Sequence, residues 1–462
     1  MSGENHLQQL LTTVAAVRAS FQEPLRDQVV QAIYQESESI SRNTVVTPAK
    51  HDAWDRKIDN IVTSRCFGYP IMFALLSLVF WLTVVGANVP SELLGNLLFG
   101  FQDHLTAFSH WIGMPDWLHG VLVLGLYRCL AWVVSVMLPP MAIFFPLFTF
   151  LEDLGYLPRI AFNLDHLFKK AGAHGKQILT MCMGFGCNAA GIVACRIIES
   201  PRERLIAILT NNFVPCNGRF PTLITTAAIL GTLLLHGYNS GTITLLVALV
   251  VLFGVFTTLG VSWLLSKTLL KGVPSTFTLE LPPYRLPKLG TLLIRSVLDR
   301  TLFVLLRAVT VAAPAGALIW ILANVQLGGV SIITYFAGWL QGVGHAIGLD
   351  GYILLAFILG LPANEIVLPI LIMIYLSQGT MVDFESITAV QNLFVSHGWT
   401  WLTAFNLILF SLLHFPCATT LLTIRQETQS AKWTWLAALI PTATAFLVCL
   451  ITAQAARLLG LV

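Results

Sequence analysis

The sequence predicts an all-α protein, a polytopic transmembrane helical bundle. Of its 462 residues, 56% are hydrophobic and only 11% are charged, whereas a soluble domain carries about 25% charged residues. The mean hydropathy is +0.77, and several segments exceed the roughly 20 apolar residues that are needed to cross a bilayer core. We therefore expect a multi-pass membrane protein that contacts lipid along most of its length.

Charge and cysteine content exclude other classes of protein. The net charge is +3, and the basic residues lie between apolar segments, which is typical of orientation signals and not of a nucleic-acid surface. The eight cysteines are scattered without a CxxC pair, so we expect no disulfide framework. The chain contains no Gly-x-x-x-x-Gly-Lys-Ser/Thr motif. Residues 172–177 resemble it, but their spacing is wrong. We therefore expect a transporter core, not an enzyme with a P-loop.

The polar N-terminal segment, 1–60, predicts a helical spacer outside the membrane. Residues 7–18 and 24–41 have the pattern of short amphipathic helices. The first span is expected at 67–87. Residues 91–117 then have the pattern of an interfacial helix, with tryptophans as headgroup anchors.

The next apolar segments are interrupted by proline and glycine. A span that begins near Val121 contains prolines at 139–140. Residues 178–198 are broken by a Gly-Phe-Gly sequence and have basic residues on both sides, which predicts a re-entrant hairpin. Residues 205–235 are interrupted by a Pro-Cys-Asn-Gly-Arg sequence, and 242–265 form an uninterrupted span.

Basic residues then predict the orientation of the chain. The basic loop, 271–300, is expected in the cytoplasm together with the N-terminus. No Lys or Arg occurs between Ala308 and Ile424, so the loops of that region are expected outside. Further spans are expected at 301–325, 401–424 and 433–455. With a second interrupted segment at 352–376, the total is about seven crossings and two hairpins.

The two halves of the chain share a sparse pattern. Gly-x-Gly-x-Asn at 184–188 is followed by Pro-Cys at 215–216, and Gly-x-Pro-x-Asn at 360–364 is followed by Pro-Cys at 416–417. The expected loops place the two hairpins on opposite sides of the membrane. This is the pattern of an inverted repeat, and transporters bind substrate where such paired broken segments meet.

Polar side chains at these breaks are the candidate site residues. Unwound backbone in a membrane is tolerated only where it is buried in protein or lines a wet cavity. Thiol, amide and carboxylate groups together suit a borderline transition metal. The candidate metal-binding residues are Cys187, Cys216, Cys417, Asn188, Asn364 and Glu365.

Simpler roles remain open for the same residues. The cysteines can be small packing residues, and Asn188 and Asn364 can cap the broken helices. Arg219, inside an apolar stretch, would neutralise a carboxylate or face a cavity.

Taken together, the motifs resemble the membrane region of the ferrous iron transport protein B family, from about residue 52 to residue 462. The resemblance implies two gate-type transmembrane halves, 61–270 and 301–462, separated by the basic loop. It is carried by Glu152-Asp-Leu-Gly-Tyr156, Gly184-Phe-Gly-Cys-Asn188, Pro201-Arg-Glu-Arg-Leu205, Pro215-Cys-Asn-Gly-Arg219, Gly360-Leu-Pro-Ala-Asn-Glu365, Phe415-Pro-Cys417 and Ile424-Arg-Gln-Glu427.

The resemblance implies a substrate and partners. Fe²⁺ would be the transported ion, with no permanently bound cofactor, and the family's cysteines correspond to Cys187, Cys216 and Cys417. The protein would lie in the inner (plasma) membrane with its N-terminus in the cytoplasm. Family members usually begin with a G domain, which this sequence lacks. We therefore expect a separate G-domain protein, a small accessory iron-transport protein and a homo-oligomer as partners.

Two other functions remain as alternatives. One is a transporter of nucleosides or other small solutes, because gate-type halves occur in proteins of that kind. The other is a non-transporting membrane scaffold for a GTPase. A nucleoside site would need aromatic groups for stacking, whereas Cys, Asn and Glu stand at the breaks. The ligand types do not separate Fe²⁺ from Mn²⁺.

Overall fold

The structure is a computed structural model that describes residues 25–44, 52–64, 66–235, 240–272, 287–381 and 387–460, together with Thr13 and Tyr284. Within these residues the protein is an all-α polytopic bundle, as the sequence predicts. Its only strands there, β1 (Gln326–Leu327) and β2 (Val330–Ser331), form a short antiparallel turn. The helix expected at 7–18 lies outside the described residues, whereas the one expected at 24–41 is α2.

The helices of the first half lead from the N-terminal segment to the basic loop. They are α2 (Leu25–Thr44), α3 (Asp52–Val62), α4 (Gly68–Trp111), α5 (Asp116–His119), the π-helix η1 (Gly120–Tyr127), α6 (Arg128–Asp153), α7 (Tyr156–Lys170), α8 (Gln177–Gly186), α9 (Asn188–Ala194), η2 (Cys195–Ile197), α10 (Pro201–Thr210), η3 (Asn211–Phe213), η4 (Asn217–Arg219), α11 (Phe220–Leu235) and α12 (Ser240–Lys267).

The second half continues to the C-terminus. Its elements are α13 (Leu289–Ile294), η5 (Arg295–Leu302), α14 (Phe303–Asn324), α15 (Ile332–Ala346), α16 (Gly351–Leu359), η6 (Asn364–Ile366), α17 (Val367–Tyr375), α18 (Ile387–Ser396), α19 (Trp401–Leu413), α20 (Ala418–Thr428) and α21 (Ala431–Leu458).

Six of the described helices are long and apolar enough to cross a membrane. The pair α15 and α16, bent by 113° between them, would form a seventh span if counted together. Two expected interruptions are wrong. Pro90 lies inside α4, which joins the expected span 67–87 to the expected interfacial helix in one helix of 44 residues. Prolines 139–140 likewise lie inside the continuous helix α6. A membrane helix tolerates the lost N–H groups because neighbouring groups satisfy the freed carbonyls.

Local capping fixes where the shorter helices begin. The side chain of Ser200 accepts a hydrogen bond from the Glu203 N–H at the start of α10, and Pro201 occupies the first helical position. Asp350 caps α16 and Thr400 caps α19 in the same way. These caps satisfy N–H groups that a helix start leaves unpaired, so three of the segments that run into a break begin at a defined residue.

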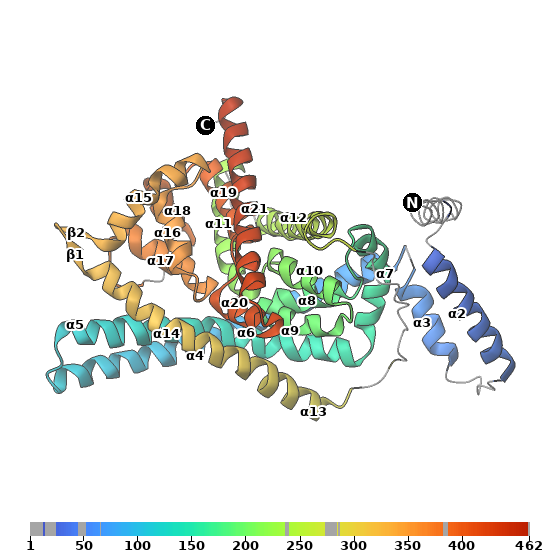
Figure 1. Cartoon of the computed structure of the whole chain (residues 1–462). Coiled ribbons are helices and arrows are strands. Elements are labelled where there is room, and N and C mark those ends of the chain that lie inside the picture. The colour runs from blue at the N-terminus through green and yellow to red at the C-terminus, as the bar shows by residue number, and fades with distance from the viewer. Residues whose placement is uncertain are drawn as a thin grey trace, which may run out of the picture.

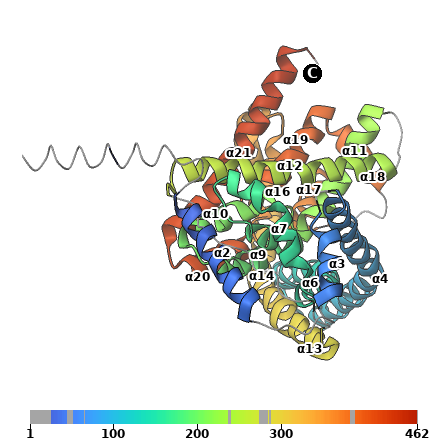
Figure 2. The same ribbon diagram turned by 90° about the vertical axis from the view of Figure 1, so that its right-hand side faces the viewer.

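The buried apolar side chains form two large clusters. One is built mainly from α6 to α10 and the other mainly from α16, α17 and α19. In Figure 1 the helices α15 to α18 gather at one end of the molecule and α2, α3 and α7 at the other, while α8, α9 and α20 meet between them. Figure 2 looks onto the end that carries α2 and α3. The breaks therefore lie in the interior, between the two clusters.

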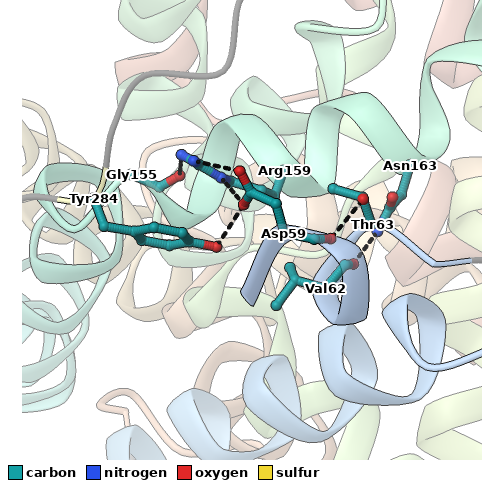
Figure 3. A network of polar contacts seen from close by, with 7 residues as sticks. All are labelled: Asp59, Val62, Thr63, Gly155, Arg159, Asn163 and Tyr284. Carbon is teal, nitrogen blue, oxygen red and sulfur yellow. Dashed lines mark hydrogen bonds and ion pairs between the residues drawn. The ribbon is translucent and has the colours of Figure 1, made fainter. Parts of the chain in front are cut away.

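A buried ion pair joins α3 to the membrane bundle (Figure 3). Arg159 in α7 is 1% exposed, and its Nε and Nη2 atoms donate to the two carboxylate oxygens of Asp59 at 3.0 and 3.2 Å. Its Nη1 atom donates to the Gly155 carbonyl at 2.7 Å. The Tyr284 hydroxyl donates to the same carboxylate at 3.0 Å, and the guanidinium carbon lies 4.1 Å from the centre of the Tyr284 ring.

This cluster holds three distant parts of the chain together. Burial raises the pKa of Tyr284 to about 12, so the hydroxyl stays protonated and remains a donor. Asn163, also in α7, donates to the Val62 carbonyl at 2.9 Å and fixes the end of α3. The segment before the first span is therefore tied to α7 and to the loop that contains Tyr284.

We expect Asp59→Asn and Arg159→Met to loosen this attachment. Each change leaves one side of a partly buried pair (side chains 1% and 23% exposed) without its charged partner, which costs less than the roughly 3 kcal/mol of a fully buried pair. The apparent melting temperature of the detergent-purified protein should fall, and trypsin should cleave faster at Lys57. Arg42→Ala is the control, because its ion pair with Glu38 is exposed (76% and 62% for the two side chains). Unchanged cleavage in both cluster variants would contradict this role.

Candidate functional site

The two hairpin breaks have the same backbone geometry. Between α8 and α9 the chain is extended at Cys187, with φ −151° and ψ 126°. Between α16 and η6 it is extended at Ala363, with φ −153° and ψ 125°. In each half the next residue, Asn188 or Asn364, begins the following helix. The shared Gly-x-x-x-Asn pattern therefore corresponds to one backbone feature that occurs twice.

The two Pro-Cys sequences also break the chain in the same way. Cys216 is extended (φ −81°, ψ 167°) and precedes η4 and α11. Cys417 is extended (φ −61°, ψ 158°) and precedes α20. Proline lacks an N–H and disfavours helix for the residue before it, so both helices that approach these positions end there.

All four breaks line one small cavity. It has a volume of about 30 Å³, which is room for roughly two water molecules. All six candidate site residues line it, namely Cys187, Asn188, Cys216, Asn364, Glu365 and Cys417. Segments more than 200 residues apart in sequence thus meet at one place in the interior.

Glu365 lies against the backbone of the first Pro-Cys break. A methyl group added at Gly218 would come within 2.4 Å of its Oε1 atom. The side chain is 7% exposed, and none of the ion pairs among the described residues involves it. Asn364 beside it donates to the Cys216 sulfur at 3.7 Å. The carboxylate of the second half therefore faces the thiol break of the first half.

The remaining thiols have different surroundings. Cys417 is partly buried and its sulfur lies 3.2 Å from the Thr420 hydroxyl. Cys187 is 8% exposed. In the described part of the chain, no three His, Cys, Asp or Glu side chains lie close enough together to hold one metal ion. The cavity thus presents its donors spread along its walls, without a closed cage.

A network of asparagines supports the first hairpin. Asn211 donates to the carbonyl and side-chain oxygens of Asn188, each at 3.4 Å. Asn188 in turn donates to the Asn212 side chain at 3.4 Å, and Asn212 donates to the His414 carbonyl at 2.6 Å. Asn188 is therefore both a cavity-lining residue and part of this network. The capping role expected for Asn188 and Asn364 is wrong, because each is the first residue of its helix and, within the described residues, neither helix start has a side-chain cap hydrogen bond.

Sequence reasoning missed several residues of the cavity wall. Met137 and Met141 of α6 line it and bring thioether sulfurs close to the thiols. Their i, i+4 spacing is visible in the sequence, but such a pair is usually a packing feature. Asn217 and Thr419 also line the cavity and were not among the candidates. Soft sulfur and hard oxygen donors thus share the site, a combination suited to a divalent transition metal.

Two family models match the chain. The model described as Nucleoside recognition (Gate) matches residues 134–230 and 305–431. The model described as Ferrous iron transport protein B C terminus matches residues 247–299. The first of these covers both pairs of breaks, one pair in each of its two segments. No solved structure matches the chain.

Curated relatives match nearly the whole chain. An Fe(2+) transporter FeoB of Staphylococcus aureus (strain COL) is 30% identical over 460 residues, which covers 94% of this chain and 66% of the relative. An Fe(2+) transporter FeoB of Methanocaldococcus jannaschii is 28% identical, over 87% of this chain and 59% of the relative. A Porphyromonas gingivalis Fe(2+) transport protein A/Fe(2+) transporter FeoB fusion protein is 26% identical, over 82% and 48%. The chain thus spans only part of the length of each relative.

We expect Gly218→Ala to displace Glu365 from the cavity. The new methyl group would overlap the carboxylate at the end of the buried Glu365 side chain. Because this end of the side chain can turn away, we expect a cost of about 1 kcal/mol, the low end for overpacking. The apparent melting temperature in detergent measures the loss. Gly260→Ala is the matched control, because nothing lies within 4 Å of the position of its new methyl group. Equal melting temperatures for the two variants would show that the carboxylate is not packed against this backbone.

Proposed function

Because the chain belongs to the ferrous iron transport protein B family, we propose that it forms the membrane pathway through which Fe²⁺ crosses the bilayer. The observation that carries this proposal is the cavity where four helix breaks meet. Its lining includes three thiols, three amides and one carboxylate. Curated relatives over most of the chain are named Fe(2+) transporters, which supports Fe²⁺ as the transported substrate.

Dehydration gives the physical reason for this donor set. A divalent cation loses its water at a large cost in a low-dielectric region, so protein ligands must replace that water along the route. Cys187, Cys216 and Cys417 provide soft donors, and Asn188, Asn364 and Glu365 provide oxygen. Transport also requires release, and dispersed donors bind more weakly than a closed four-coordinate site. Fe²⁺ is thus the moving substrate and no metal is a resident cofactor.

The contacts outside the spans support the proposed orientation. Tyr284 of the basic loop bonds to Asp59, and Arg202 donates to the Leu270 carbonyl at 2.6 Å. The loop, the N-terminal segment and the start of α10 therefore lie on one side of the bundle. By the positive-inside rule we assign that side to the cytoplasm, in a multi-pass protein of the inner (plasma) membrane.

The division into halves and the partners are part of the proposal. The two segments of the Gate match support a first transmembrane half at 61–270 and a second at 301–462, with 1–60 as a cytoplasmic spacer and 271–300 as a cytoplasmic loop. The fused relative supports a small accessory iron-transport protein as partner. A separate G-domain protein would act on the spacer, which the Asp59 ion pair ties to α7. The protein would also form a homo-oligomer.

A nucleoside transporter is the second candidate, because the Gate family model is described by nucleoside recognition. The cavity argues against it on two grounds. Its volume of about 30 Å³ is far below that of a small-molecule site, typically about 300–1,000 Å³. Among the described residues no aromatic ring lines it, so a base would have no stacking partner at the four breaks; aromatic rings such as Phe144 and Phe185 line the adjoining, larger cavity of about 520 Å³. A scaffold without transport would not need four breaks around a polar cavity.

We expect Cys187→Ser, Cys216→Ser and Cys417→Ser each to reduce Fe²⁺ uptake into proteoliposomes. Loss of one soft donor should lower the rate on the order of tenfold, comparable with removal of a group that tunes a metal site. Glu365→Gln should reduce uptake as well, because it removes the cavity's carboxylate. Uptake is measured with a fluorescent iron indicator inside the vesicles, in the presence of ascorbate to keep iron ferrous.

Two buried cysteines outside the cavity serve as controls. Cys129 and Cys449 are both 0% exposed and do not line the cavity, so Cys129→Ser and Cys449→Ser should transport normally at equal reconstitution. If all five serine variants transport equally well, the thiols are not part of the pathway. If the wild-type vesicles take up nucleosides but no Fe²⁺, the second candidate replaces the first.

A further inference from the structure

The two Pro-Cys breaks leave carbonyl groups without helical partners inside the membrane bundle. The last C=O groups of a helix have no partner within that helix, and such groups are costly to leave unsatisfied in a bilayer. α10 passes through η3 and ends at Phe213, while α19 ends at Leu413. The C-terminal ends of these two helices, with their carbonyl groups unpaired inside the helix, come together at the buried side chain of Arg219.

Arg219 donates to carbonyls from both helix ends. Its side chain is 1% exposed. Nη1 donates to the main-chain carbonyls of Asn212 at 2.8 Å and Leu412 at 2.7 Å. Nη2 donates to the carbonyls of His414 at 3.2 Å and Phe415 at 3.3 Å, and to the side-chain oxygen of Asn212 at 3.1 Å. The guanidinium therefore bridges the first and second halves of the chain.

Within the described residues, all the hydrogen-bond acceptors of Arg219 are carbonyl oxygens. None of the ion pairs among the described residues involves Arg219. The expectation that Arg219 neutralises a carboxylate thus finds no support. The partial negative charge of the two helix C-termini balances the guanidinium instead. Asn212 also donates to the His414 carbonyl at 2.6 Å, which holds the same two helix ends together.

Such an arrangement is the usual way in which membrane proteins bind free cations. Unwound carbonyls and the C-terminal ends of half-helices coordinate cations in transporters, and rings of carbonyls replace the hydration shell of monovalent ions in channels. Here four main-chain carbonyls and one amide oxygen converge on a tethered guanidinium. The place that a free cation would take is filled by part of the protein.

We propose that Arg219 is a built-in cation that occupies a carbonyl site for a monovalent cation at the junction of the two broken helices, and that truncation of this side chain opens that site to free monovalent cations. The inference goes beyond the proposed function and does not depend on Fe²⁺ being the substrate. It assigns Arg219 a positioning role, because the guanidinium holds Cys216 and Cys417 at a fixed separation. It also keeps abundant alkali ions out of a site next to the cavity.

The test is cation rescue of Arg219→Ala. The detergent-purified variant is melted in choline chloride, and then with millimolar methylguanidinium, guanidinium or potassium replacing choline at constant ionic strength. We expect the apparent melting temperature to lie below that of the wild type in choline and to rise with methylguanidinium and guanidinium, less with potassium. The wild type should not respond, because its site is filled. A variant that no cation stabilises would overturn the proposal.

Asn406→Ala is the matched control. Asn406 is a 0% exposed residue of α19 that donates to the Ile347 carbonyl at 2.8 Å. Its loss should destabilise the same helix without creating a cation site. We expect no cation-specific recovery in this variant. Equal recovery of both variants would mean that the cations act generally, and would also overturn the proposal.

A second pair of variants covers the case in which Arg219→Ala does not fold. Lysine retains the charge and reaches some of the carbonyls, whereas methionine has a similar length without charge. Arg219→Lys should therefore give a larger monodisperse fraction in size-exclusion chromatography than Arg219→Met. Equal fractions would show that the positive charge is not required at this place.

Discussion

Every backbone N–H and C=O group inside a bilayer must find a partner within the protein, and this constraint governs the structure around the four helix breaks. A helix break is tolerated only where another segment supplies the missing hydrogen bonds. The N–H of Ala418, at the start of α20, donates to the carbonyl of Leu361 in the other break of the same half at 2.7 Å. Arg219 does the same between the halves. The breaks therefore satisfy one another, and for this reason they gather around one cavity.

Within this shared backbone frame the two halves differ in their side chains. The extended residue of the hairpin is Cys187 in the first half and Ala363 in the second, although their backbone angles agree within a few degrees. One residue beyond the shared asparagine, the first half has Ala189 and the second has Glu365. A symmetric fold thus carries an asymmetric set of donors. Among the six candidate residues the carboxylate comes from the second half alone, whereas thiols come from both halves.

Local signals in the sequence predicted the spans and the breaks, and distance in the sequence limited the rest. Gly184, Gly186 and Pro362 mark the hairpins because glycine and proline act on their own backbone. The same reasoning failed at prolines 139–140, which lie inside the continuous helix α6, because lost N–H groups are tolerated where neighbouring groups satisfy the freed carbonyls. All six candidate residues line one cavity, and their role in metal binding stays a prediction.

Contacts between distant residues were beyond a single sequence. Nothing near Arg159 indicates that Asp59, 100 residues earlier, is its partner. Arg219 was expected to meet a carboxylate or a cavity, but three of its five acceptors are main-chain carbonyls about 200 residues later. A main-chain acceptor cannot be recognised from the sequence, since every residue has a main-chain carbonyl. The two methionines of α6 were recognised as possible ligands only because they line the cavity.

The claim that Fe²⁺ contacts sulfur inside the membrane is central to this account. X-ray absorption at the iron K edge of purified protein loaded anaerobically with Fe²⁺ tests it most directly. The account predicts sulfur scatterers in the first coordination shell together with oxygen or nitrogen, and loss of part of the sulfur signal in Cys216→Ser. A first shell of oxygen and nitrogen alone, unchanged by that substitution, would contradict it.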